Sequence, residues 1–280
     1  MAELTARPAE AGRVSAGSGL MWGLVSLCVL AQVAYPLVAG SARDALTVVT
    51  VVLCFAAAAG HAALTRGVRV AALLVAVTAG GGLLVEAAGT ATGFPFGAYD
   101  YAGSLGPRVL GVPLVIPLAW TMMAWPAWLV AGRLVGGGGL ARVVLAGWAL
   151  ASWDLFLDPQ MVDAGHWAWR HPDPGLPGVA SVPLTNYAGW VVVAVAMMAV
   201  FQAAAGSRGG TPGSNRMGDG PMFAFYLWTY FSSVLAHLAF FGLPASALWG
   251  GLAMGTVALP LAAALTSARR GGAHPCAVAR

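Results

Sequence analysis

The sequence predicts an all-α protein, a polytopic membrane bundle of about eight transmembrane helices. Of its residues, 59% are hydrophobic and only 9% are charged, whereas a soluble domain carries about 25% charged residues. Apolar runs near the length of about 20 residues that crosses a bilayer recur along the chain. We therefore expect one transmembrane domain at residues 20–266, between disordered cytoplasmic tails at 1–19 and 267–280.

Eight apolar runs are long enough to be membrane spans. They lie at residues 20–39, 45–64, 69–88, 110–131, 140–157, 184–204, 221–242 and 246–266. The first exceeds the apolar core of a signal peptide, about 7–15 residues, and we interpret it as a membrane anchor. The break at Gly242-Leu243-Pro244 is the weakest, so seven helices are the alternative.

The placement of arginine predicts how the chain is oriented. With eight spans, only Arg43, Arg108 and Arg170 of the 14 basic residues, all of them arginines, fall on one side of the membrane. Basic residues accumulate in cytoplasmic loops, so both termini are predicted to be cytoplasmic in a multi-pass protein of the cell membrane. The aromatic loops at 89–109 and 158–183 then lie on the outer face. The arginines on the predicted cytoplasmic side account for the positive net charge, which does not indicate nucleic-acid binding.

Two segments share a pattern at the start of a predicted helix. GVPLVIPLAW at 111–120 and SVPLTNYAGW at 181–190 both carry Val-Pro-Leu followed by Trp at the same spacing. Each follows an aromatic, Gly-rich loop, which suggests two helix-loop-helix repeats with a site between them. The alternative is coincidence, because Pro is common at helix starts and Trp is common at membrane interfaces.

Three carboxyl groups stand near the outer ends of predicted helices. Glu86 lies about one turn inside its helix, and Asp154 and Asp158 are four residues apart on one helical face. We expect Pro159 to end that helix. A charge at mid-bilayer costs roughly 2.5–3.5 kcal/mol, so such residues face protein or water. Burial favours the protonated carboxyl, which suits a proton donor; the alternative is a structural acid bonded to Trp, Tyr or Asn.

The sequence offers no pattern for a metal or cofactor site. No pair of histidines has the spacing of a metal motif such as HExxH, and Cys28, Cys54 and Cys276 have no paired spacing. Glycine-rich phosphate-binding motifs in their structural context are also missing from the sequence. We therefore predict neither a metal nor a cofactor.

Four segments in this order resemble a known family: GFPFGAYDY, AWTMMAWPAW, WDLFLDPQMVDAGHWAW and VPLTNYAGW. They are similar to the integral-membrane carotenoid biosynthesis family that includes the CruF-type carotenoid 1,2-hydratases, over roughly residues 80–240. The resemblance implies hydration of the terminal isoprenoid double bond of an acyclic carotenoid end to a tertiary alcohol. Its substrates would be γ-carotene or lycopene-type ends or a C50 precursor of bacterioruberin. Its partners would be the lipid bilayer and other carotenoid biosynthesis enzymes.

Hydration by this route needs a proton donor, a group that deprotonates water, and surroundings that tolerate a carbocation. We assign the catalytic roles to Asp154 as acid or base, Glu86 as the complementary group, and Asp158, which would position water. Aromatic faces stabilise cations, and Trp120 and Trp125 are expected to line the cation pocket. The full set of predicted substrate-binding residues is Trp120, Trp125, Asn186, Tyr187, Phe94, Phe96, Tyr99, Trp153 and His237.

Three other functions stay open at this point. A carotenoid cyclase also begins by protonating a polyene end, but a neighbouring double bond captures the cation. Intramembrane acids also mark proton-coupled transporters, which need a polar path through both leaflets. A structural membrane partner in a pigment complex is the remaining non-enzyme alternative.

Overall fold

The bundle of eight spanning helices is confirmed. The computed structural model describes residues 8–136, 138–206 and 218–271, and within this part eight helices are long and apolar enough to cross a membrane. The break near Gly242 is real, because one helix ends at Ala239 and the next begins at Pro244. Seven helices are therefore ruled out, while the orientation across the membrane stays a prediction.

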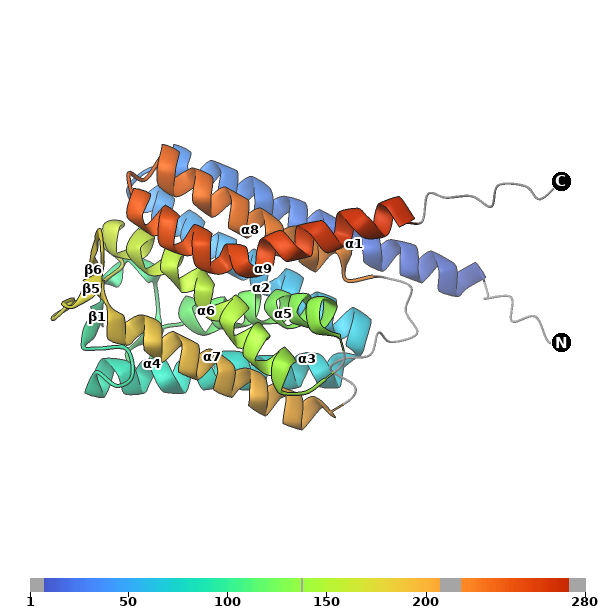
Figure 1. Ribbon diagram of the computed structural model, residues 1–280, viewed down its shortest axis with the longest axis horizontal. Helices are drawn as coiled ribbons and strands as arrows, with labels where there is room; N and C mark the ends of the chain where they lie inside the picture. The colour runs from blue at the N-terminus through green and yellow to red at the C-terminus, as the bar shows by residue number, and fades with distance from the viewer. Residues whose placement is uncertain (1–7, 137, 207–217, 272–280) are drawn as a thin grey trace.

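The elements follow one another in a simple up-and-down order (Figure 1). The helices are α1 (Pro8–Ala34), α2 (Ser41–Arg66), α3 (Val68–Val75), α4 (Gly81–Thr92), α5 (Val115–Val135), α6 (Leu140–Asp163), α7 (Leu184–Ala205), α8 (Gly220–Ala239) and α9 (Pro244–Gly271). Short helical turns are η1 (Tyr35–Leu37), η2 (Ala76–Gly80) and η3 (Gly103–Leu105). Strands are β1 (Tyr99–Tyr101), β2 (Arg108–Val109), β3 (Val112–Pro113), β4 (Trp167–Trp169), β5 (Gly175–Leu176) and β6 (Val179–Pro183).

The end helices are longer than expected. α1 begins at Pro8 and α9 continues to Gly271, so parts of the predicted tails at 1–19 and 267–280 are helical. The rest of those tails, residues 1–7 and 272–280, lies outside the described residues. The start of α1 and the end of α9 point the same way, away from the strands (Figure 1).

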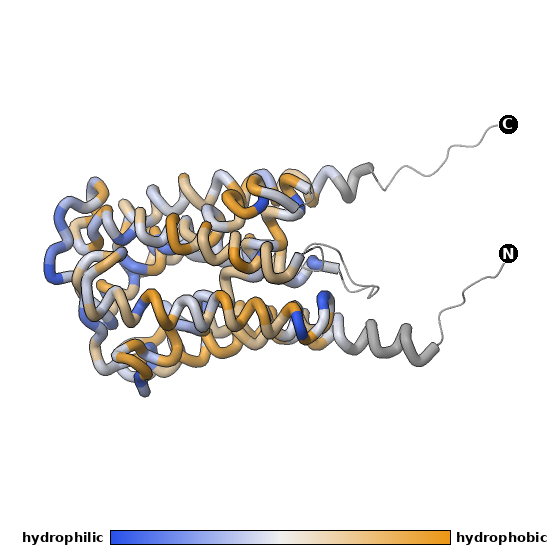
Figure 2. The backbone as a smooth tube through the Cα atoms, turned by 90° about the horizontal axis from the view of Figure 1, so that it is seen from below, coloured by the Kyte–Doolittle hydropathy of each residue, from blue (hydrophilic) through white to orange (hydrophobic). Residues whose placement is uncertain are grey.

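Helix α5 forms the centre of the bundle. It contacts α2, α6, α8 and α9. Of the residues in its most hydrophobic 18-residue segment, 83% are buried. The helix is apolar on every side, as a fully surrounded helix must be. The outer helices instead expose large apolar side chains such as Leu30, Leu84 and Val192. Hydrophilic residues gather toward the ends of the tube in Figure 2, which leaves an apolar wall suited to lipid.

The third span contains a π-helical turn, η2, between α3 and α4. Thr78 in this turn donates to the carbonyl of Leu74 and lies 2.8 Å from it, and its hydroxyl is 2.7 Å from that of Thr121 on α5. Gly82 follows, where an added Cβ would lie 2.7 Å from the indole Cδ1 of Trp120. The π-turn and the glycine together let Trp120 reach α4, one turn before Glu86.

Helix α6 does not end at Pro159, contrary to the sequence prediction. It continues to Asp163 with Pro159 inside it. A proline within a helix cannot donate to the carbonyl four residues earlier, here that of Leu155. The hydroxyl of Ser246 on α9 donates to this carbonyl at 2.6 Å, and His237 on α8 lies 3.0 Å from the carbonyl of Phe156. Tertiary contacts thus supply the missing hydrogen bonds.

The two segments with the shared Val-Pro-Leu pattern meet in space. Their tryptophans, Trp120 and Trp190, stack with ring centroids 4.0 Å apart and an angle of 9° between the planes. The loops before them also pair, since β1 and β4 form an antiparallel ladder in which Tyr99 faces Trp169. Equivalent positions of the two units therefore contact each other, as expected of a repeat with a site at its junction.

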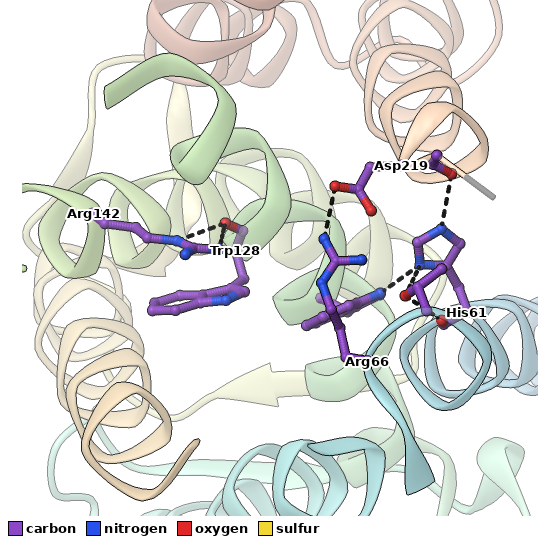
Figure 3. Close-up of polar contacts among 8 residues, drawn as sticks. His61, Arg66, Trp128, Arg142 and Asp219 are labelled. Carbon is purple, nitrogen blue, oxygen red and sulfur yellow. Dashed lines mark hydrogen bonds and ion pairs between the residues drawn. The ribbon is translucent and has the colours of Figure 1, made fainter. Parts of the chain in front are cut away.

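A second polar cluster lies at the end of α2 and the start of α8, toward the opposite end of the bundle from β1 (Figure 1), and Figure 3 shows its contacts. His61 accepts a hydrogen bond from Trp125 Nε1 at 3.0 Å, and Arg66 pairs with Asp219 at 2.9 Å. Arg142 stacks over the Trp128 ring, 3.9 Å from its centroid, and donates to the Trp128 carbonyl. These contacts link α2, α5, α6 and the start of α8.

We predict that Ser246→Ala destabilises the protein. The change leaves the partly buried Leu155 carbonyl without the hydroxyl donor, which should cost about 1 kcal/mol. The measurement is thermal unfolding of the purified protein in detergent. Thr266→Ala is the control, because Thr266 is an exposed residue on the same helix that bonds only to its own helix at Ala263. Equal stability of the two variants would contradict the account of Pro159.

We also predict that Asp219→Asn lowers stability by about 1–2 kcal/mol. The loss is smaller than for a fully buried pair because 21% of the Asp219 side chain is exposed. Asp100→Asn provides the matched control, since Asp100 pairs with Arg170 at 2.8 Å but is 62% exposed. The control should leave the unfolding temperature unchanged, and a shift as large as that of Asp219→Asn would be evidence against this ranking.

Candidate functional site

Glu86 is buried on α4 and accepts three hydrogen bonds. The hydroxyls of Tyr99 and Tyr101 on β1 both donate to Oε2, the second at 2.8 Å. Trp120 Nε1 on α5 donates to Oε1 at 3.0 Å. Every one of these partners is a donor, which is the arrangement that a carboxylate requires. The group is thus held rigidly, with both oxygens in use.

Asp154 and Asp158 form a second group one helical turn apart on α6. The amide nitrogen of Asn186 on α7 donates to Asp154 Oδ2 at 2.8 Å and also to Asp158 Oδ2. Trp167 Nε1 on β4 donates to Asp158 Oδ1 at 3.1 Å. Asp154 Oδ1 is buried and has no hydrogen-bond partner among the described residues. One amide therefore couples two buried carboxyl groups.

A small cavity is lined by both Glu86 and Asp158. Its volume is about 30 Å³, and a water molecule needs roughly 10–15 Å³ on this measure. Its lining comprises Glu86, Phe96, Tyr99, Tyr101, Ile116, Ala119, Trp120, Leu157, Asp158, Trp167, Trp169, Asn186 and Trp190. Two carboxyl groups and a stacked indole pair thus face one space with room for a water molecule.

A larger, mostly apolar cavity lies beside the first. Its volume is about 140 Å³, and it is lined by residues of α1, α2, α5, α6 and α8. Ile116, Ala119, Leu157 and Trp167 line both cavities. An apolar cavity of about 150 Å³ accommodates benzene. The larger cavity is therefore wide enough for one five-carbon isoprenoid unit next to the acids.

The two tyrosines that hold Glu86 are kept protonated. Burial raises the pKa of Tyr99, and the neighbouring Glu86 carboxyl adds to the effect. Burial and Glu86 likewise raise the pKa of Tyr101. A phenol with a raised pKa remains a donor at neutral pH, so the hydrogen bonds to Glu86 persist under physiological conditions.

The structure brings most of the predicted site residues together. Glu86, Asp158, Trp120, Asn186, Phe96 and Tyr99 line the small cavity, and Trp153 lines the large one. Asp154, which we predicted to be the main acid or base, is not among the lining residues of either cavity. It is linked to the small cavity through Asn186. Of the two aspartates, Asp158 is therefore the one that borders the small cavity.

Four predicted substrate-binding residues lie away from both cavities. Trp125 bonds to His61 in the opposite cluster, because five residues turn a helix by about 500°, so Trp125 points about 140° away from Trp120 and lies further along the axis. Phe94 is 77% exposed. His237 contacts the carbonyls of Ser233 and Phe156. The buried Tyr187 hydroxyl has no hydrogen-bond partner within the described part of the chain.

The predicted site missed seven residues of the small cavity, and three of these contact its acids or Trp120. Tyr101 donates to Glu86, Trp167 donates to Asp158, and Trp190 stacks on Trp120. In the sequence, these three residues resemble the Trp and Tyr side chains that are common at membrane interfaces. The shared spacing of Trp120 and Trp190 was the one signal that could have identified Trp190.

The described residues contain no cluster of three or more His, Cys, Asp or Glu side chains arranged to hold a metal ion. The acids are occupied by indole, phenol and amide donors instead. Carboxyl groups, hydrogen-bond donors and aromatic faces line the small cavity.

Comparison with known proteins identifies relatives of this chain. A family described as carotenoid biosynthesis protein matches residues 46–257. A bisanhydrobacterioruberin hydratase from Haloarcula japonica is 34% identical over 112 residues, which is 39% of this chain and 36% of that protein. The matched part thus spans only about a third of the relative's length. No solved structure matches the chain.

The raised pKa values of Tyr99 and Tyr101 predict a loss of stability at alkaline pH. Both phenols stay protonated in the folded state, while in the unfolded chain they ionise near pH 10. The two phenols therefore contribute fully to the free energy of unfolding below that pH, and their contribution falls as the pH rises above it. Unfolding free energies measured across this range should fall less steeply for Tyr101→Phe than for the wild type. Identical slopes would show that Tyr101 ionises freely in the folded protein.

Proposed function

The chain belongs to the carotenoid biosynthesis protein family, and we propose that it is a carotenoid hydratase. In this proposal it adds water across the terminal isoprenoid double bond of an acyclic carotenoid end and produces a tertiary alcohol. The substrate class follows the hydratase from Haloarcula japonica, whose name states its substrate. The enzyme would be a hydro-lyase that works in the membrane without a cofactor.

The observation that carries the proposal is the pair of adjoining cavities. The larger one fits an isoprenoid end, and the smaller one has room for water between Glu86 and Asp158. Ile116, Ala119, Leu157 and Trp167 border both spaces. A double bond at this border would have a carboxyl group and a water molecule within reach, which is what hydration requires.

Asp158 is the proposed proton donor. It lines the small cavity, and it shares the Asn186 amide with Asp154. Two neighbouring carboxylates in a dry site repel each other, so the pair is expected to retain a proton between them. Transfer of this proton to the less substituted carbon of the double bond leaves the positive charge on the tertiary carbon. Asp154 would act through Asp158 as a positioning residue.

Glu86 is the proposed proton acceptor. Its three donors hold it as an acceptor across the cavity from Asp158. Water in the small cavity would add its oxygen to the tertiary cation and give one proton to Glu86. The product is the alcohol, and transfer of one proton from Glu86 back to the aspartate pair restores the starting state. No electron is gained or lost, so the reaction balances without a redox cofactor.

The stacked indoles of Trp120 and Trp190 complete the proposed mechanism. They line the small cavity, and the face of an indole attracts a cation by about 0.5–2 kcal/mol. The cation would otherwise form in an apolar space, where an isolated charge is costly. The indoles and the carboxyl groups would lower this cost together.

A carotenoid cyclase is the nearest competing enzyme. It would need the same proton donor but no water, so the room for water beside Asp158 favours hydration. A proton-coupled transporter would need a polar path between the two ends of the bundle. Among the described residues, neither the small nor the larger cavity is lined by the acids at one end together with His61 or Arg66 at the other.

Expression in a host that accumulates acyclic carotenoids tests the reaction. The expected pigment is heavier than its precursor by the mass of one water for each end that reacts. Chromatography with mass detection separates the outcomes, because cyclisation leaves the mass unchanged and inactivity leaves the precursor. Pigment with a cyclised end and no added water would refute the hydratase.

Variants of the acids test the assigned roles. Asp158→Asn and Glu86→Gln keep the size of each side chain but remove proton transfer, and we expect hydration to fall by about 10²–10⁴-fold. Asp154→Asn should reduce it less. Product formation per amount of folded protein, checked by size-exclusion chromatography, is the measurement.

Asp163→Asn is the matched control, because Asp163 ends the same helix but is exposed. It should form product at the wild-type rate. Wild-type turnover by Asp158→Asn would remove Asp158 from the mechanism while leaving the reaction itself to the pigment analysis.

A further inference from the structure

His237 is a buried residue of α8 that the proposed mechanism does not use. None of its surface is exposed, and it lines neither the small cavity nor the larger one. Both nitrogens of its ring contact backbone carbonyl oxygens. Nδ1 lies 2.8 Å from the carbonyl oxygen of Ser233 on the same helix, and Nε2 lies 3.0 Å from that of Phe156 on α6. The ring therefore bridges two helices.

These two contacts place a requirement on the ring. A carbonyl oxygen accepts hydrogen bonds and never donates one, whereas a neutral imidazole has one N–H and one nitrogen that only accepts. A neutral ring can thus bond only one of the two carbonyls and turns the lone pair of its other nitrogen toward the second oxygen. The imidazolium ion has two N–H groups and satisfies both carbonyls. The observed geometry is therefore that of a doubly protonated ring.

The position of His237 in its helix favours the second proton. The residue lies in the last turn of α8, which ends at Ala239, and a cation is stabilised near the C-terminus of a helix by the helix dipole. Burial away from water opposes the charge, whereas the two carbonyl contacts support it. The charge state of this ring is therefore balanced between opposing effects, which makes it sensitive to pH.

The ionisable side chains around His237 do not bond to its ring. They are Asp154 and Asp158 on α6, Tyr35 in η1 and Arg43 at the start of α2. Both aspartates bond to an amide of α7. Phe241 stands between the tyrosine and the histidine, and the arginine lies over the tyrosine ring. Within the described part of the chain, no carboxyl group forms an ion pair with His237, so the carbonyl contacts decide what the proton does.

The Phe156 carbonyl belongs to the turn of α6 that carries the proposed proton donor. Phe156 stands two residues before Asp158. Its ring packs edge-on against that of His237, with centroids 5.2 Å apart. It also packs against Gly250 of α9, where an added Cβ would lie 2.7 Å from the ring. Pro159 removes a backbone hydrogen bond from this turn, so contacts from α8 and α9 set its position.

We propose that His237 is a positioning residue that fixes the Asp158 turn of α6 only while its ring carries two protons. The protonated ring holds α8 and α6 together through both carbonyls. Loss of one proton releases one carbonyl and loosens the turn that directs Asp158 to the small cavity. The inference rests on the proposed function and deepens it, because it makes hydration depend on a proton outside the reaction itself. Positioning is complete at low pH and is lost as the pH rises.

Nitrogen NMR of the full-length protein in lipid nanodiscs, with its five histidines isotope-labelled, tests the protonation without any substrate. At about pH 5, below the pH near 6.5 at which an ordinary histidine titrates, both ring nitrogens of His237 should carry protons. One of them should lose its proton as the pH rises. The spectrum of His237→Gln assigns the signal, and replacing the other histidines assigns it if that variant does not fold. A ring with a single proton at every pH at which the protein is folded would overturn the proposal.

The kcat for hydration, measured from about pH 5 to about pH 8, tests the positioning role. His237→Phe keeps a ring but has no N–H donor. The carboxyl groups titrate in both proteins, so the ratio of wild-type to variant kcat isolates the histidine. Small displacements of a catalytic group are costly, and we expect a ratio of about tenfold at the acid end that falls severalfold as the pH rises. His237→Gln supplies an N–H donor that does not titrate, so it should exceed His237→Phe by a factor that stays constant with pH.

His171→Phe is the matched control, because His171 is exposed on the loop after β4, and it should keep the wild-type pH profile. A ratio of wild type to His237→Phe that does not change with pH would overturn the positioning role and leave the hydratase intact. Equal activity of His237→Gln and His237→Phe would also overturn it, since donation to the carbonyls would then not matter. A wild type that hydrates no carotenoid at any pH would instead reject the proposed function, and the NMR titration would still decide the protonation of His237.

Discussion

Glu86, Asp154 and Asp158 are buried in a bundle that has few other polar groups, and their hydrogen bonds make this burial possible. An unpaired carboxylate away from water is among the most costly groups in a protein. Five donors from four other elements compensate here: Tyr99 and Tyr101 on β1, Trp120 on α5, Trp167 on β4 and Asn186 on α7. The acids therefore hold the loops in place as much as the loops hold the acids.

Two helix irregularities aim these groups at one another. The π-turn η2 and Gly82 let the Trp120 indole approach the helix that carries Glu86. The proline at 159 follows directly after Asp158, and Ser246 satisfies the carbonyl that it leaves free. Irregular helices concentrate at functional sites because they place side chains where a regular helix would not. Both irregularities here lie within about a turn of a carboxyl group or of its donor.

The two ends of the bundle have different chemistry. At the end with the strands, carboxyl groups border space that a ligand and water can fill. At the other end, His61, Arg66 and Asp219 bond to one another or to neighbouring backbone and indole groups (Figure 3). One end thus holds carboxyl groups beside open space, and at the other end the polar groups link α2, α5 and the start of α8. A membrane-spanning polyene would present only its end group to such a site.

The sequence determined the number of spans and the presence of carboxyl groups within them. Both follow from hydrophobicity, since every residue of a span must suit lipid or a dry interior, and a carboxyl group within it stands out. It also showed the spacing shared by Trp120 and Trp190, whose indoles stack in the structure. These properties depend on local composition or fixed spacing, which can be observed without knowing any contact.

Only the tertiary structure decided which groups meet. It placed Asp158 rather than Asp154 on the cavity, sent Trp125 to the opposite cluster, and continued α6 past Pro159. Each outcome depends on partners far along the chain: Asn186 and Trp167 for the aspartates, His61 for Trp125, and Ser246 for the helix. Helix propensity and helical periodicity cannot predict these contacts. The contacts depend on the free energy of packing and hydrogen bonding between different segments of the chain.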